Sequence, residues 1–222
     1  TNDRDEIVPY NIRLAQGASS AEPWLATASN ATSGACSDPA SLKVAVVDSG
    51  VDVSHPDLPC REVGEDGANC VGKEFGVFNE TWDAPRNPHG THVLGILAAR
   101  RGNDQGVVGM IGEPTQVCYL IAQVFGADGG SKNSAVIDAV EWAVQNGATV
   151  VNLSLGSETR SYAAEQYFAA LRADGVLTVA AAGNDGTTAL HCTLRRVRVY
   201  AMDCMIGLHS MEVSHIASSH RP

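Results

Sequence analysis

Asp48 and His89 are a carboxylic acid and an imidazole that lie at the ends of predicted regular elements, where they can take part in proton transfer. Asp48 directly follows the apolar run 44–47, which is typical of a strand buried on both faces of a parallel sheet. Ligands of open α/β sheets bind outside the carboxyl ends of the strands, so the Asp48 carboxylate is expected to face a cleft. The alternative is that Asp48 only caps the turn at Ser49 and Gly50.

His89 follows Pro88 and starts the segment HGTHVLGILAAR, in which apolar residues recur at helical spacing over 89–100. The positive end of the helix dipole disfavours the protonated imidazole, and a general base has to be neutral. Gly90 permits a close approach of this helix to a neighbouring strand. If Asp48 orients the imidazole, the two residues supply the acid and the base of a nucleophilic triad.

The plainer interpretation of His89 and His92 is a pair of histidines that only cap and pack a helix. A metal site is not predicted here, because the H-E-x-x-H spacing is absent and a site would need a third ligand. The pattern therefore favours acid–base chemistry without a metal ion.

Two further segments lie at strand ends. Asn184 closes the run AAAGN, where its carboxamide can donate a hydrogen bond to a developing oxyanion. Ser154, Leu155 and Gly156 continue a strand beyond its ladder, where an extended peptide can pair main chain to main chain. Each has an alternative, a turn asparagine in the first case and the exit of a strand in the second.

The elements that must position these residues alternate along the chain. Strands are predicted over 44–48, 117–125, 149–156 and 176–184, helices over 89–100, 134–146 and 161–174, and a long loop over 54–88. Ser131 to Ser134 are the N-cap candidates of the second helix, and Gly147 and Gly175 are C-cap signals. This order predicts an α/β fold of three layers, with a mostly parallel sheet and helices on both of its faces.

Composition limits the classes of partner. The chain of 222 residues carries a formal net charge of -10, which argues against a nucleic-acid partner, and it has no apolar run long enough to cross a membrane. We expect one domain over 44–189, a polar lead-in over 1–43 and a divergent tail over 190–222, where the alternation of helix and strand stops. Thr1 is not an initiator methionine, so we expect a processed chain or a fragment.

The six cysteines contain no C-x-x-C pair, which disfavours a zinc or redox motif. Cys60 and Cys70 bracket a polar loop and are the pair most suited to a disulfide, although the sequence alone does not determine the connectivity. Asn30 and Asn79 begin glycosylation sequons in loop-like surroundings, whereas the sequon at Asn152 falls in a predicted buried strand and is discounted. These features favour a secreted protein.

Five motifs, in the same order along the chain, resemble those of the subtilisin-like serine proteases. They are DSGVDVSHPDL (48–58), HGTHVLGILAA (89–99), GVVGMIG (106–112), VVNLSLGS (150–157) and AAAGN (180–184). The resemblance covers 44–189 and implies a subtilisin-like fold and a serine endopeptidase. Position by position, it implies that Asp48 is the triad acid, His89 the triad base and Asn184 the oxyanion donor. It also implies that 154–156 holds the substrate backbone.

The same resemblance implies a polypeptide substrate, an inhibitory propeptide, no required cofactor and a monomer. Structural calcium is also implied, although no loop of the sequence has the EF-hand pattern. Two other enzyme classes explain the sequence less well. A small-molecule α/β hydrolase would need the absent G-x-S-x-G elbow, and an aspartyl-phosphate receiver would leave HGTH and AAAGN without a purpose.

The sequence departs from the family at the nucleophile, because the motif Gly-Thr-Ser-Met-Ala-x-Pro-His is absent. In the nearest segment, 207–217, Ser210, Met211, His215 and Ala217 keep the relative spacing, but the Thr, the Pro and the closing Gly are missing. Either Ser210 is the nucleophile or the likeness arose by chance in an altered or incomplete C-terminal part. Two functions follow, a serine endopeptidase that is inactive if the serine is lacking and a non-catalytic peptide-binding protein on the same scaffold.

Overall fold

The computed structural model describes residues 34–62, 68–111, 116–157, 161–181 and 198–199. Within these ranges six strands form one sheet in the order β2-β3-β1-β4-β5-β6, and every neighbouring pair is parallel. The elements in chain order are β1 (Leu42–Asp48), η1 (Pro59–Glu62), β2 (Cys70–Glu74), α2 (His89–Ala98), β3 (Val117–Gln123), α3 (Asn133–Gln145), β4 (Val150–Leu153), α4 (Tyr162–Ala173), β5 (Leu177–Ala180) and β6 (Arg198–Val199). The predicted parallel α/β class is confirmed.

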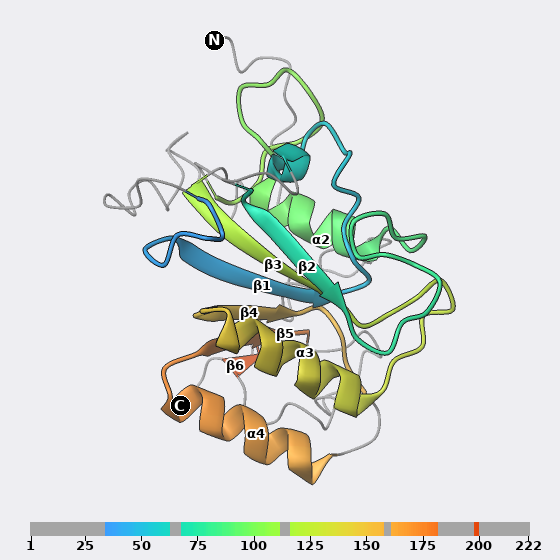
Figure 1. The fold of residues 1–222 in the computed structure, drawn as a ribbon, viewed down its shortest axis with the longest axis vertical. Helices are drawn as coiled ribbons and strands as arrows, with labels where there is room; N and C mark the ends of the chain where they lie inside the picture. The colour runs from blue at the N-terminus through green and yellow to red at the C-terminus, as the bar shows by residue number, and fades with distance from the viewer. Residues whose placement is uncertain (1–33, 63–67, 112–115, 158–160, 182–197, 200–222) are drawn as a thin grey trace, which may run out of the picture.

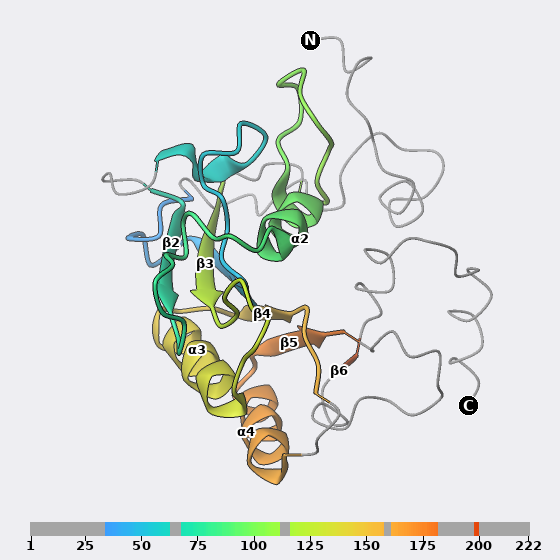
Figure 2. The same cartoon turned by 90° about the vertical axis from the view of Figure 1, so that its right-hand side faces the viewer.

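Helices cover both faces of this sheet, with α2 on one face and α3 and α4 on the other (Figure 1 and Figure 2). Val44 and Val46 of β1 pack in one buried cluster with Leu94 of α2. Ala45 and Val47 belong to a second cluster, which they form with α3 and α4. Successive side chains of a strand point to opposite faces, so a strand covered on both faces is apolar throughout, as β1 is.

The edge strand β2 lies within the stretch 54–88, which the sequence predicts as a loop, so that prediction is wrong there. β2 pairs only with β3 among the described strands. It contains Gly72 and ends on Lys73 and Glu74, and an edge strand of this composition has no continuous apolar run to reveal it. The ring of Trp82 occupies the space that a Cβ atom on Gly72 would need.

The predicted helices are present with small changes at their ends. The N-cap of α3 is Lys132 and no side chain caps the helix, so the predicted cap by a serine of 131–134 is wrong. Ser161 caps α4, and its hydroxyl accepts a backbone hydrogen bond from the first turn. Gly147 and Gly175 follow their helices with φ angles of 92° and 86°, which confirms both as C-cap signals.

Several predictions fall outside the described residues. They concern most of the lead-in 1–43, most of the tail 190–222 and the end of the predicted strand 176–184. Among the helices that the structure describes, none is both long and apolar enough to span a bilayer.

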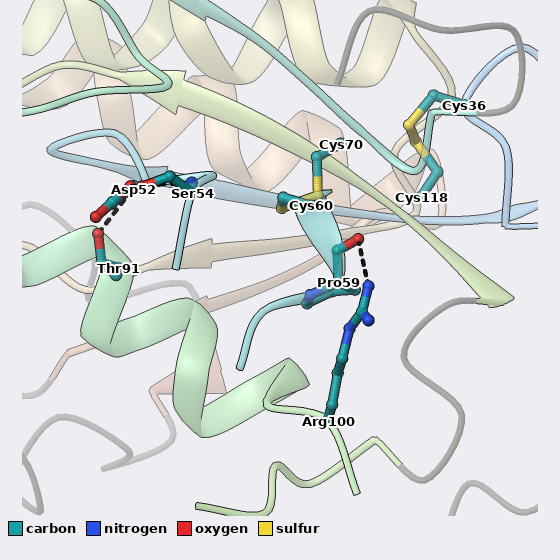
Figure 3. The surroundings of a disulfide bond; sticks show 9 residues. All are labelled: Cys36, Asp52, Ser54, Pro59, Cys60, Cys70, Thr91, Arg100 and Cys118. Atoms are coloured by element: carbon teal, nitrogen blue, oxygen red, sulfur yellow. Dashed lines mark hydrogen bonds between the residues drawn. A yellow bond between two sulfur atoms is a disulfide. The ribbon is translucent and has the colours of Figure 1, made fainter. Parts of the chain in front are cut away.

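Two disulfides join four of the cysteines (Figure 3). Cys60 and Cys70 are bonded, which confirms the predicted pair and closes the loop before β2. Cys36 is bonded to Cys118 of β3, at a sequence separation of 82 residues. The bond between Cys36 and Cys118 thus attaches the segment before β1 to β3, the neighbour of β1 in the sheet. The sequence alone did not determine this pairing.

Tyr119 of β3 is fully buried, and this burial raises the pKa of its hydroxyl above the ordinary value of 10.0. The folded state thus holds the phenolic proton more tightly than the unfolded state does. The contribution of this hydroxyl to the free energy of unfolding is therefore fully present below about pH 10, and it is lost as the pH rises above that value.

We expect the replacement Tyr119→Phe to move alkaline unfolding to higher pH, as followed by tyrosinate absorbance. Tyr162, which is 67% exposed, is the control, and Tyr162→Phe should leave the unfolding pH unchanged.

Candidate active site

Asp48 is the last residue of β1, and its side chain is only 1% exposed. Its Oδ1 atom accepts a hydrogen bond of 2.7 Å from the backbone N–H of Ser49. Its backbone carbonyl accepts another of 2.7 Å from the N–H of Val124, just beyond β3. A central strand and its neighbour thus hold the carboxylate in a fixed place at the carboxyl edge of the sheet.

His89 is the first residue of α2 and faces this carboxylate. Its Nδ1 atom lies 2.8 Å from Oδ1 and 3.0 Å from Oδ2 of Asp48. A carboxylate at this distance accepts a hydrogen bond, so a neutral imidazole here has its proton on Nδ1 and its basic lone pair on Nε2. The side chain of His89 is 39% exposed, which leaves the imidazole accessible from solvent. The expected contact between the acid and the imidazole is therefore present in the structure.

Side-chain hydrogen bonds fasten the start of α2 to the loop after β1. The Ser49 hydroxyl donates to the carbonyl of Asn87 (3.0 Å) and accepts from the N–H of Gly90 (2.9 Å). The N–H of Asp52 donates to Thr91 Oγ1 at 2.9 Å (Figure 3). Sequence reasoning missed the role of Ser49, because a serine after a strand is common in turns. The signal that could have revealed this role was that Ser49 directly follows Asp48, the candidate acid, in the sequence.

Gly90 makes the close approach of α2 and β1 possible, as the sequence predicts. A Cβ atom at this position would clash with the carbonyl oxygen of Gly50 and would lie 3.2 Å from Asp48 Oδ1. The contacting oxygen of Gly50 is a backbone atom, so it cannot swing aside as a flexible side chain can. The hydrogen bond between His89 and Asp48 thus depends on the absence of a Cβ atom at position 90.

We expect the replacement Gly90→Ala to lower the free energy of unfolding by about 1–3 kcal/mol, the range seen for overpacked sites. Urea denaturation of the purified chain measures this change. Gly95 of the same helix is the matched control, because a Cβ atom there meets nothing within 4 Å. Gly95→Ala should instead stabilise the chain by about 0.5–1 kcal/mol through helix propensity. Equal effects of the two replacements would contradict the close-approach explanation.

The segment 154–156 lies beyond the end of β4, which stops at Leu153. The Nδ2 atom of Asn152 donates a hydrogen bond of 2.9 Å to Ser154 Oγ. A pocket of about 260 Å³ borders this segment and the first turn of α3. Its apolar lining includes Phe125, Val136, Leu153, Leu155, Ala164 and Phe168. The lining contains neither Asp48 nor His89.

Two predicted site residues lie outside the described residues. They are Asn184, the predicted oxyanion donor, and Ser210, the candidate nucleophile. The structure thus brings Asp48 and His89 together, and the catalytic roles of all four residues remain predictions.

Structural calcium, which the family resemblance implies, is not located among the described residues. Within those ranges, no group of three or more His, Cys, Asp and Glu side chains is placed to hold a metal ion. The buried Asp57 uses both carboxylate oxygens for other partners, since Oδ1 accepts from Asn103 Nδ2 (3.0 Å) and Oδ2 from the N–H of Val107 (2.9 Å). We therefore assign no metal site and derive no step through a metal ion.

Comparison with known proteins gives a consistent result. A profile of the Subtilase family, Peptidase_S8, matches residues 40–200. Subtilisin DY from Bacillus licheniformis is 37% identical over 155 residues, which cover 70% of this chain and 52% of that protein. Subtilisin BL from Lederbergia lenta is 40% identical over 161 residues, which cover 72% of this chain and 54% of that protein. The chain thus spans about half the length of these curated relatives.

A solved structure has the same fold. The crystal structure of a psychrophilic subtilisin-like protease from the Antarctic psychrotroph Pseudoalteromonas sp. AS-11 matches with a TM-score of 0.58 at 31% sequence identity. The match covers 72% of this chain and 35% of the other. The sheet and helices that position Asp48 and His89 are therefore those of a known protein class.

Proposed function

Because this chain belongs to the subtilase family, we propose that it acts in peptide-bond hydrolysis as a serine endopeptidase, with Asp48 as the acid and His89 as the base. The observation that carries this proposal is the 2.8 Å hydrogen bond between His89 Nδ1 and Asp48 Oδ1. The buried carboxylate fixes the tautomer of the imidazole, and the exposed side of the ring leaves room for a nucleophile and a substrate.

The proposed reaction has two halves, acylation and deacylation of a serine. His89 Nε2 takes the proton of a serine hydroxyl as the serine oxygen attacks the substrate carbonyl carbon. Asp48 stabilises the imidazolium that forms, while Asn184 and a backbone N–H hold the oxyanion. The imidazolium then gives its proton to the leaving amine, and the peptide C–N bond breaks. In the second half of the reaction His89 takes a proton from water as the water oxygen attacks the acyl carbon. The imidazolium then returns this proton to the serine oxygen, and the acyl group is released.

We propose that the substrate is a polypeptide that binds in an extended conformation along Ser154, Leu155 and Gly156. This segment lies beyond the end of β4, where its main chain can pair with a peptide. The neighbouring pocket is lined by Leu155 together with the aromatic residues Phe125 and Phe168, so it suits an apolar side chain of the substrate.

We further propose that the protein is secreted, works as a monomer and is held inactive by a propeptide until it is processed. The domain is expected to cover 44–189, with 1–43 as lead-in and 190–222 as a divergent tail. Two disulfides support this proposal, because they favour an oxidising compartment.

The second candidate function is a non-catalytic peptide-binding protein on the same scaffold. The absence of a Gly-Thr-Ser-Met-Ala motif from the sequence favours it. Without a nucleophile, acceleration over the uncatalysed reaction is limited to roughly 10³–10⁴-fold. We therefore expect the purified chain to hydrolyse labelled casein at a negligible rate. Labelling of Ser210 by a serine-directed phosphonate, with loss of the label in His89→Ala, would contradict this expectation.

The transcript of the natural gene separates the two candidate functions. If the protein is an endopeptidase, the transcript should encode a Gly-Thr-Ser-Met-Ala segment, and its product should cleave casein. The replacement His89→Ala should abolish this cleavage, while His92→Ala, which changes an exposed neighbour on α2, should retain it. A transcript that encodes 190–222 as they stand, with a product that binds casein without cleaving it, would favour the peptide-binding function.

A further inference from the structure

Asn79 begins the sequon Asn79-Glu80-Thr81 on the connection between β2 and α2. Asn79 has a φ angle of 61°, in the left-handed region that is typical of tight turns. Both Asn79 and Thr81 are exposed, and among the described residues neither side chain has a hydrogen-bond partner. The carboxamide nitrogen and the hydroxyl of this sequon are therefore available to an enzyme that modifies the folded surface or the emerging chain.

The residue between them fixes the turn in place. Glu80 Oε1 accepts a hydrogen bond of 2.9 Å from the N–H of Ala127, and its Oε2 accepts one of 3.3 Å from the N–H of Arg86. The carboxylate thus ties the turn to the loop after β3. A group attached to Asn79 would leave the protein from a defined point beside that loop.

Phe78, which directly precedes the sequon, is 82% exposed, the largest exposed fraction among the large apolar residues that the structure describes. An aromatic ring in water is unfavourable, and it is stabilised when an apolar surface covers it. The C–H face of a sugar attached to the adjacent residue provides such a surface. The exposed ring is therefore a second observation in favour of a carbohydrate at this turn.

The sequon at Asn152 has the opposite environment. Asn152 lies within β4, is 8% exposed and uses its Nδ2 atom to donate a hydrogen bond to Ser154 Oγ. A glycan on that nitrogen would have to pass through the packed sheet. Molecules that acquired it would not reach the folded state, so the folded protein carries no glycan there.

From these contrasts we infer that Asn79 is an acceptor site for an N-linked oligosaccharide, whereas Asn152 is not. The donor is an oligosaccharide attached to a polyprenyl diphosphate in a eukaryotic secretory compartment. The Nδ2 atom of Asn79 forms a bond to the sugar C1 atom as the bond from C1 to the phosphate oxygen breaks. The lipid diphosphate leaves with the electron pair, and the amide loses one proton. This inference rests on the proposed secretion of the protein and does not depend on the proposed protease activity.

The test is secretion of the 222-residue chain from yeast behind a yeast signal peptide, in an Asn30→Gln background that removes the sequon outside the described residues. Secreted protein is treated with peptide N-glycosidase in ¹⁸O-water, which marks each former glycan site as a labelled aspartate. We expect the label at position 79 and unlabelled asparagine at position 152. Asn79→Gln and Thr81→Ala should lose the glycan, and Thr81→Ser should keep it, because the sequon accepts either hydroxyl.

Two results would overturn the inference. One is secreted protein whose Asn79 peptide is entirely unlabelled, since secretion proves that the chain passed through the compartment that holds the donor. The other is a label at Asn152 in the folded, secreted fraction, which would show that burial in β4 does not decide which sequon is used.

Discussion

Replacing Asp48 with asparagine should reverse the tautomer of the His89 imidazole. In the wild-type chain the carboxylate accepts from Nδ1–H at 2.8 Å, so the basic lone pair of the ring is on Nε2. An asparagine carboxamide at the same place can donate to Nδ1, which moves the ring proton to Nε2 and removes the basic nitrogen from the nucleophile's side. In a form of the protein that cleaves peptides, we expect kcat to fall by about 10⁴-fold, the loss typical of the wrong tautomer.

The ring-nitrogen shifts of His89 in a ¹⁵N NMR spectrum measure the tautomer directly and do not require turnover. Asp52→Asn is the matched control, because Asp52 lies on the same loop, is more exposed and uses Oδ1 for Ser54. It should leave the His89 spectrum unchanged. An unchanged spectrum in Asp48→Asn would mean that the carboxylate does not orient the ring, and the assignment of Asp48 as the acid would then be wrong.

Removing the disulfide between Cys36 and Cys118 should cost the chain about 4.5 kcal/mol in free energy of unfolding. The estimate comes from the loop entropy of a closure over 82 residues. Without the bond the unfolded chain gains conformations, and the segment before β1 is no longer joined covalently to β3. The double replacement by alanine avoids burying a hydroxyl group, and urea denaturation of both forms measures the difference.

The disulfide between Cys60 and Cys70 is the internal control, because its loop covers a sequence separation of only 10 residues. The same relation gives a loss of about 3 kcal/mol for its double alanine variant. The long-loop variant should therefore be the less stable of the two. If the order were reversed, strain or residual structure in the unfolded chain would outweigh loop entropy in this protein.

Much of the site could be predicted because its signals are local. The apolar run before Asp48, the helical period after His89 and the glycine at position 90 each depend on neighbours within a few positions. The carboxyl ends of parallel strands meet at one edge of a sheet, so these local signals also indicated where the acid would face. The contact of Asp48 with His89, 41 positions away, followed from combining them.

Other features could not be predicted, because their signals were weak or shared by many structures. β2 has only five residues and contains Gly72 and two charged residues, so its composition matches a loop as well as an edge strand. The serine-rich start of α3 suggested a cap, yet Lys132 occupies that position without a side-chain hydrogen bond. Packing of the apolar face of α3 against the sheet stabilises the helix without a cap.

Local apolar periodicity and glycine placement were thus sufficient to establish the chain's parallel α/β class and the position of an acid and a base at the ends of two elements. Folding in three dimensions established the rest: the order of the strands, the bond from Cys36 to Cys118, and the fastening of α2 by Ser49. The reason is physical. Periodicity reports which face of an element is buried, whereas the partner that covers that face is chosen by the packing of segments far apart in the chain.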